Sequence, residues 1–267
     1  MSVDWQEMQK EMFPIKDYAA LSKRWQDAFS YEFVCKAYNF SMSEISDYTR
    51  RLLGGDPRQR YEAYCQQLVA MIDQLEKAEV EDIIDLVGRV DTSQQFEAFI
   101  DQVKIEPKEV MVLLKYLVYW VIPTKKYLSG LVIKGSPIEP AVKTLGNLGI
   151  RTNLEMLQQG LTPADRNALA ETSGLPVEQV DECTHTADFS RMPWTSKATI
   201  SNIIRSGYGS ITQLANADRE KMVQDFLSYG ASIGKNLKFG NEIESSYRIA
   251  KIIPLVLVEL KSSISIN

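Results

Sequence analysis

The sequence predicts an all-α protein, and three observations carry this prediction. Apolar residues recur every three or four positions over most of the chain, which is the spacing of one buried helix face. Alternation of apolar and polar residues, which is typical of a half-buried strand, never persists for more than a few positions. Ser, Thr or Asp often precedes a run with helical spacing and Gly often follows it, as helix caps do.

The N-terminal half is predicted to consist of helices. Apolar residues at helical spacing predict one long helix over residues 15–38. Ser41 followed by Glu44 is a capping-box pattern that starts the next helix, and Gly54-Gly55 ends it. Further helices are expected from Asp56-Pro57 to Leu75, at about 80–88 and 93–103, and from Pro107 to 121. Aromatic residues at helical spacing are expected in the core: Trp25, Phe29, Phe33, Tyr61 and Tyr64.

The C-terminal half is also predicted to be helical. Gly130, Gly135 and Pro137 cluster at a plausible boundary, so we expect two domains, residues 1–128 and 129–267. Expected helix starts are Pro140, Thr152, Thr162-Pro163, Pro176, Thr195 or Ser196, Ser210 and Asp218, and expected stops are Gly149, Gly174 and Gly207. The last helix is expected over about 241–260, bent or restarted at Pro254, with an apolar stretch from Ile252 to Leu260.

An internal repeat is the most informative feature of the C-terminal half. Residues 149–156 (GIRTNLEM) and 207–214 (GYGSITQL) share a Gly, an apolar residue, a spacer, Thr or Ser, and a final apolar residue. The two segments lie 58 residues apart, and each follows a helix-like stretch. The repeat predicts two units in which one helix stops at Gly and a second helix starts at Thr or Ser.

Composition is that of a soluble globular protein, with 45% hydrophobic and 24% charged residues. A net charge of −5 argues against a protein that binds nucleic acid over its whole surface. Three cysteines without a CxxC motif indicate reduced thiols, which suits a cytoplasmic protein. The apolar stretch 110–122 contains Lys115 and is too short to span a bilayer, so no membrane association is expected.

Catalytic motifs are scarce. His185 is the single histidine, which excludes a metal site with several His ligands. Cys183 lies two positions from it and would point to another helix face, so a Cys–His nucleophile pair is not expected. The chain has no P-loop, G-x-G-x-x-G or G-x-S-x-G motif. We therefore expect a protein that is not an enzyme and that uses no cofactor or metal.

Residues 130–230 resemble an uncharacterised bacterial family of tandem helix-hairpin-helix domains. The resemblance is carried by both Gly turns and by the linker TPADRNALAETSGLP (162–176) between them. In such hairpins, a G-x-G turn brings backbone amides close to a phosphate at the start of a helix. The resemblance therefore implies binding of nucleic acid through the two hairpins.

The two hairpin turns depart from that pattern. In the second, Trp194 and Ser196 stand at the Gly positions, after Pro193, and Trp194 would block the ordinary approach of a phosphate. In the first, Lys134-Gly135-Ser136-Pro137 keeps one Gly of two. Trp194 either fills the gap between the hairpin units, which is the favoured interpretation, or stacks on a base or sugar.

Local gaps in acidic residues favour phosphate binding in a protein whose net charge is negative. Residues 110–138 contain no Asp or Glu, and neither do residues 189–217. Each of these two segments contains one predicted hairpin. We predict weak, sequence-independent nucleic-acid binding through Arg191, Ser196, Lys197, Arg205, Lys125, Lys126 and Lys134. The alternative is a protein-interaction or oligomerisation scaffold in which the hairpins pack on a protein partner or on a second copy of the chain.

Overall fold

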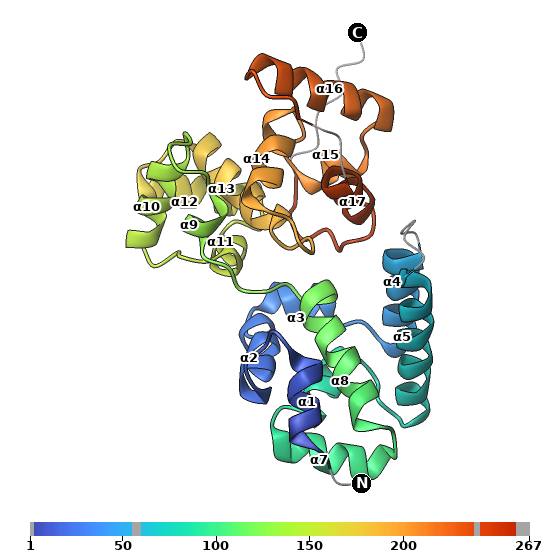
Figure 1. The fold of residues 1–267 in the computed structure, drawn as a ribbon. Helices are drawn as coiled ribbons and strands as arrows, with labels where there is room; N and C mark the ends of the chain where they lie inside the picture. The colour runs from blue at the N-terminus through green and yellow to red at the C-terminus, as the bar shows by residue number, and fades with distance from the viewer. Residues whose placement is uncertain (1–2, 55–59, 238–240, 260–267) are drawn as a thin grey trace. The chain divides into compact units, whose positions relative to one another are not determined.

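The protein is all-α, as predicted. The computed structural model describes residues 3–54, 60–237 and 241–259. Within these ranges the backbone forms helices and no sheet, and only two isolated antiparallel bridges occur, Ser41–Asp82 and Tyr127–Thr152. The chain divides into two compact units, Met1–Thr124 (unit 1) and Lys125–Asn267 (unit 2) (Figure 1). No helix of the described ranges combines the length and the apolar character needed to cross a membrane.

Unit 1 is built from helices around an aromatic and aliphatic core. The helices are α1 Trp5–Met12, α2 Tyr18–Phe29, α3 Glu32–Tyr38, α4 Met42–Gly54, α5 Arg60–Lys77, α6 Ile83–Arg89, α7 Ser93–Val103, α8 Pro107–Tyr116 and the π-helical turn η1 Leu117–Val121. Helices α4 and α5 lie side by side (Figure 1). Trp25 and Phe33 are buried as predicted, whereas Phe29, Tyr61 and Tyr64 are half-buried.

The prediction of one long helix over residues 15–38 is wrong. Helix α2 ends at Phe29, because the Ser30 hydroxyl donates to the Asp27 carbonyl oxygen (2.8 Å) and Tyr31 adopts an extended backbone before α3. The capping box that starts α4 is confirmed, since the Ser41 N–H donates to Glu44 Oε2 at 2.8 Å. The predicted cap at Asp56-Pro57 lies outside the described residues.

Unit 2 contains a succession of short helices. They are α9 Leu128–Leu131, α10 Glu139–Asn147, α11 Asn153–Gln159, α12 Pro163–Ser173, α13 Val177–Phe189, α14 Lys197–Arg205, α15 Ile211–Ala215, α16 Arg219–Ser232 and α17 Asn241–Ala250. The predicted N-caps Thr152, Thr162, Ser196, Ser210 and Asp218 all accept backbone hydrogen bonds. Most helix starts in this unit were therefore predicted correctly.

The prediction of a helix through residues 251–260 is wrong over its described part. Helix α17 ends at Ala250, and residues 251–259, here called the C-terminal segment, form no helix. Pro254 lacks the N–H that a helix would need. The segment is instead held by the Val258 N–H, which donates to the Leu161 carbonyl oxygen at 2.9 Å.

Two buried arginines also bind this C-terminal segment. Arg191 Nη1 donates to the Pro254 carbonyl oxygen at 3.0 Å, and Arg166 Nη2 donates to that of Val258 at 3.3 Å. Both arginines are buried, and each is balanced by a carboxylate, Asp188 for Arg191 and Asp181 for Arg166. Backbone hydrogen bonds thus hold the segment against the rest of unit 2, with Ile253 and Leu257 buried and Leu255 and Val258 exposed.

Candidate nucleic-acid interface

Unit 2 contains the two repeated helix pairs that the sequence predicts. The first helix pair is α10 with α11, and the second is α14 with α15, at the expected spacing of 58 residues. Gly149 and Gly207 have φ of +90° and +102°, which an L side chain rarely adopts. Thr152 then caps α11 and Ser210 caps α15. The Gly-apolar-x-Thr/Ser pattern is therefore a helix stop followed by an N-cap in both copies.

The loop before each pair contains a tight turn. In the first, the Ser136 N–H donates to the Ile133 carbonyl oxygen (3.0 Å), and Gly135 has φ +80°. In the second, the Thr195 N–H donates to the Met192 carbonyl oxygen (3.4 Å), and Trp194 has φ +57°. A bulky residue with positive φ is uncommon, because its Cβ crowds the backbone. Trp194 is 53% exposed. This exposure disagrees with the favoured interpretation, in which the ring fills the gap between the two hairpin units.

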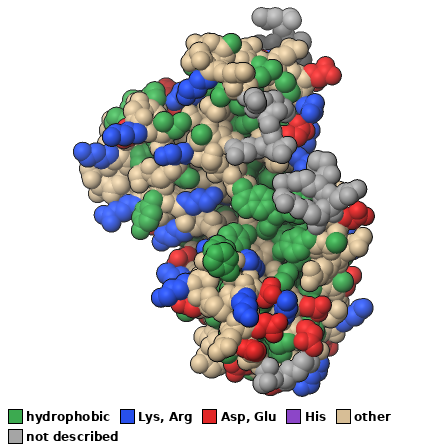
Figure 2. All heavy atoms as spheres, in the orientation of Figure 1, with side chains coloured by type: hydrophobic (Ala, Val, Ile, Leu, Met, Phe, Trp, Pro, Cys, Tyr) green, Lys and Arg blue, Asp and Glu red, His purple; other side chains and the backbone are tan. Residues whose placement is uncertain are grey.

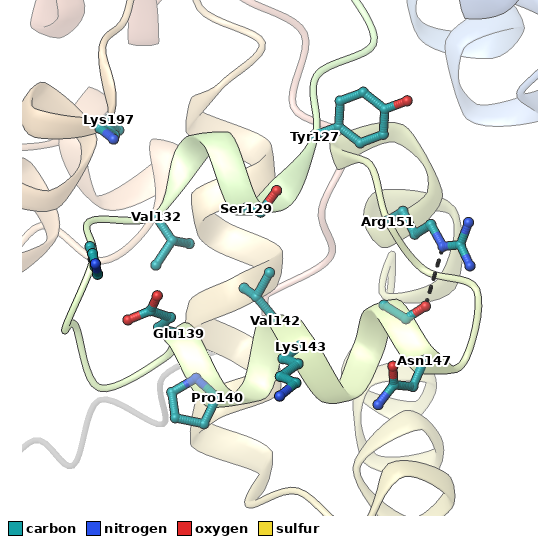
Figure 3. A pocket seen from close by; sticks show the side chains of 12 residues that line it. Tyr127, Ser129, Val132, Glu139, Pro140, Val142, Lys143, Asn147, Arg151 and Lys197 are labelled. Atoms are coloured by element: carbon teal, nitrogen blue, oxygen red, sulfur yellow. Dashed lines mark hydrogen bonds between the residues drawn. The ribbon is translucent and has the colours of Figure 1, made fainter.

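A groove of about 880 Å³ lies on the first helix pair and extends to the start of α14. We call it the basic groove. Figure 3 shows α10 running along it, with Glu139 and Lys197 toward one end and Asn147 and Arg151 toward the other. Its lining residues are Tyr127, Ser129, Val132, Lys134, Glu139, Pro140, Val142, Lys143, Gly146, Asn147, Arg151 and Lys197.

Positive charge predominates in the basic groove. Four of the lining residues are cationic, namely Lys134, Lys143, Arg151 and Lys197, and one is acidic. All four cationic residues are exposed. Figure 2 shows Lys and Arg side chains over the part of unit 2 that carries α9 to α12, whereas Asp and Glu side chains are frequent on unit 1. Such a groove attracts anions even though the whole chain is negative.

The carboxylates near this groove are occupied by backbone donors. Glu139 Oε2 accepts from the Gly135 N–H at 2.5 Å. Glu155 Oε2 accepts from the N–H groups of Arg151 and Thr152 at 2.8 and 2.9 Å. Burial raises the pKa of Glu155, but these and further favourable interactions together outweigh it and hold the pKa below its ordinary value. In the described part of unit 2, no carboxylate lies within ion-pair distance of Lys134, Lys143 or Lys197. The three ammonium groups are therefore available to a ligand.

The structure brings together only two of the predicted site residues in this groove, Lys134 and Lys197. They come from different helix pairs, since Lys134 precedes α10 and Lys197 is the first residue of α14. The hydroxyl of Ser196 accepts from the Thr199 N–H at 3.1 Å and so serves as the N-cap of α14. Lys125 is exposed, with its Nζ 3.9 Å from Glu155 Oε1.

The other three predicted residues are committed to contacts within unit 2. Arg191 is buried against Asp188 and Pro254, so its guanidinium does not reach solvent. Arg205 pairs with Glu182. Lys126 Nζ donates to the Ser190 carbonyl oxygen at 2.5 Å, and burial lowers its pKa. These three cations stabilise the helical unit and do not line the groove.

Sequence reasoning missed Lys143, Arg151 and Tyr127. The sequence signal for a basic segment is a stretch without acidic residues, and Glu139 and Glu155 interrupt such a stretch around Lys143 and Arg151. The signals that could have found them are the exposed side of α10 for Lys143 and, for Arg151, the spacer position of the repeat, two residues after Gly149. Tyr127 carried no sequence signal, because its exposure depends on the fold.

The described ranges contain no group of three or more His, Cys, Asp and Glu side chains placed to hold a metal ion. Cys183 is buried, and burial raises the pKa of its thiol to about 12. His185 lies near Glu259, with 3.8 Å between Nδ1 and Oε1.

Residues 138–236 match a family model described as a domain of unknown function (DUF4332). The match covers both helix pairs and the helices between them, which is the region of the internal repeat. The expected resemblance to an uncharacterised family is thereby confirmed, whereas its helix-hairpin-helix character stays a prediction. Neither the curated proteins nor the solved structures include a match to this chain.

Proposed function

We propose that this protein binds nucleic acid, independently of sequence, through the basic groove of unit 2. The observation that carries the proposal is the convergence of Lys134, Lys143, Arg151 and Lys197 on one groove. Three of these cations have no carboxylate partner in the described part of the unit, so binding a phosphate breaks no existing ion pair. Exposed Lys and Arg side chains supply most of the affinity in binding that ignores base sequence.

Charge distribution along the chain supports this assignment. Residues 125–267 carry 16 Lys and Arg against 14 Asp and Glu, whereas residues 1–124 carry 14 against 21. A polyanion is therefore repelled by unit 1 and attracted to the groove of unit 2. The function that we propose is binding, without a catalytic step.

The proposal is tested by fluorescence anisotropy with a labelled oligonucleotide at low and at moderate salt. Lys143→Glu is expected to weaken binding about tenfold, because it replaces one phosphate contact by a repulsive charge. The matched control is Lys235→Glu, which makes the same charge change at an exposed residue of unit 2 that does not line the groove.

Two results would contradict the proposal. The first is the absence of oligonucleotide binding at low salt, which would leave the alternative, a protein-interaction or oligomerisation scaffold. Light scattering on the same sample then measures whether the chain self-associates. The second is equal weakening by Lys143→Glu and Lys235→Glu, which would mean that net charge and not the groove is responsible.

A further inference from the structure

One aromatic side chain of the basic groove is exposed to solvent. Tyr127 lines the groove, and 70% of its surface is exposed. Figure 3 shows its ring at the rim of the groove, on the side where Arg151 lies. A tyrosine ring offers a flat apolar face on which a nucleobase can stack.

The backbone that carries Tyr127 is anchored on both sides. The Leu128 N–H donates to the Arg151 carbonyl oxygen and the Asn153 N–H to that of Lys126, both at 2.9 Å. The Lys126 N–H in turn donates to Asn153 Oδ1 at 2.8 Å. Tyr127 and Thr152 thus form a short antiparallel bridge. The exposed ring is presented from a fixed position beside Arg151, which lowers the entropy lost when a ligand binds.

The length of the groove suits a strand and not a single nucleotide. Six of the nine residues of α10 line it, including the first, Glu139, and the last, Asn147, and the helix is about 13 Å long. Phosphates on one strand of a duplex are spaced about 3.4 Å apart along the axis, so this length matches about four nucleotides at that spacing. Lys197 lies toward one end and Arg151 toward the other, so cations are available along the whole path (Figure 3).

We propose that the basic groove is selective for single-stranded nucleic acid, with one base stacked on Tyr127 and the adjoining phosphates bound by Arg151, Lys143, Lys134 and Lys197. This inference rests on the proposed function and specifies its ligand class. Selectivity arises because the faces of bases inside a duplex are covered by their neighbours, whereas a base of a single strand is free to stack on a side chain.

The test compares three labelled ligands with the full chain: a short single strand, the same sequence as a duplex, and a strand of equal length with abasic sites throughout. The single strand is expected to bind most tightly. Tyr127→Ala is expected to weaken its binding about 5- to 150-fold, the fold-change equivalent to about 1–3 kcal/mol for one base–aromatic stack. Tyr127→Phe keeps the ring and is expected to keep the affinity.

The abasic strand separates stacking from charge. The abasic strand is expected to bind the unmodified protein and Tyr127→Ala equally well, because it has no base that could stack on the ring. Two results would overturn the inference but leave phosphate binding intact. One is equal affinity for the single strand and the duplex. The other is that Tyr127→Ala weakens binding of the abasic strand as much as binding of the ordinary strand. Failure of all three ligands to bind at low salt would overturn the proposed function as well. Far-UV circular dichroism and a melting curve establish that each variant is folded.

Discussion

The side chain of Asn153 donates from Nδ2 to Ser190 Oγ at 2.9 Å, while its Oδ1 accepts from the Lys126 N–H at 2.8 Å. Asn153 is fully buried at the start of α11, and Ser190 directly follows α13. One amide therefore joins three segments that are far apart in the sequence: the strand-like residues before α9, the first helix pair, and the loop before the second pair. This relationship fixes the backbone on which Tyr127 stands.

Asn153→Ala is accordingly expected to lower the free energy of unfolding by about 1–3 kcal/mol, because the Lys126 N–H loses a buried acceptor. Urea denaturation measures the change. Asn147→Ala alters an exposed Asn of α10 and is expected to shift stability by less than about 0.5 kcal/mol. Equal effects of the two substitutions would show that the Asn153 bonds contribute nothing specific.

The repeated glycines are expected to respond alike to substitution. Gly149→Ala and Gly207→Ala each place a Cβ on a residue with positive φ, at a cost of about 1–2 kcal/mol, although no atom lies within 4 Å of the added carbon. Gly146→Ala, three residues earlier and inside α10, meets no atom either, and is expected to stabilise by up to about 1 kcal/mol. Thermal denaturation of the three variants distinguishes conformational strain from steric clash. Destabilisation by all three would contradict this explanation.

Salt dependence of binding is expected to report how many cations of the groove contact phosphate. Four contacts to a single strand predict a slope of about −3 in a plot of log K against log salt concentration, since each contributes about 0.7. Lys197→Gln is expected to reduce the steepness by about 0.7, whereas Lys235→Gln should leave it unchanged. A slope near zero would exclude phosphate contacts as the source of affinity.

Thiol reactivity is expected to separate the three cysteines. Burial raises the pKa of Cys183 to about 12 and raises that of Cys65, while Cys35 is half-buried. Near pH 8, a thiol reagent should modify Cys35 in the folded protein and the other two only after unfolding, because the thiolate is the reactive form. Cys35→Ser should abolish the rapid phase. Rapid modification of all three thiols in the native protein would contradict the burial of Cys65 and Cys183.

The same pKa of Cys183 predicts a loss of stability in alkali. The unfolded chain ionises this thiol near its ordinary pKa of about 8.5, whereas the folded protein keeps it neutral. Its contribution is therefore complete below about pH 8.5 and declines as the pH rises toward 12. Urea midpoints measured for the unmodified protein and for Cys183→Ala should converge over this interval; parallel curves would rule out this thiol as the cause.

Local signals in the sequence predicted the helix boundaries of unit 2 well. Gly149, Thr152 and Ser210 act through their own backbone or through a residue three positions away, so their roles are readable from short segments. The C-terminal segment was predicted wrongly, because its backbone serves as acceptor for Arg166 and Arg191, which are distant in sequence. The break at Ser30 was missed for a related reason, since apolar spacing continues through it.

The groove was predictable only in part. Lys134 and Lys197 were found because acidic residues are absent around them, but Arg191 from the same reasoning is buried on Asp188, three residues before it. Lys143 and Arg151 were overlooked because Glu139 and Glu155 lie nearby in sequence. The structure shows that both carboxylates accept backbone N–H groups. Whether a charge faces a ligand or caps a helix depends on side-chain geometry that spacing does not specify.

The C-terminal segment also bears on where fragment boundaries should be placed in this protein. A fragment trimmed to residues 138–236 would lack Lys126, whose N–H binds Asn153, and would lack the carbonyl acceptors of Pro254 and Val258. Arg166 and Arg191 would then keep their ion pairs with Asp181 and Asp188 but lose the backbone carbonyl acceptors of the C-terminal segment. The residues matched by the family model, 138–236, thus span less than the compact unit, which begins at Lys125 and includes the C-terminal segment.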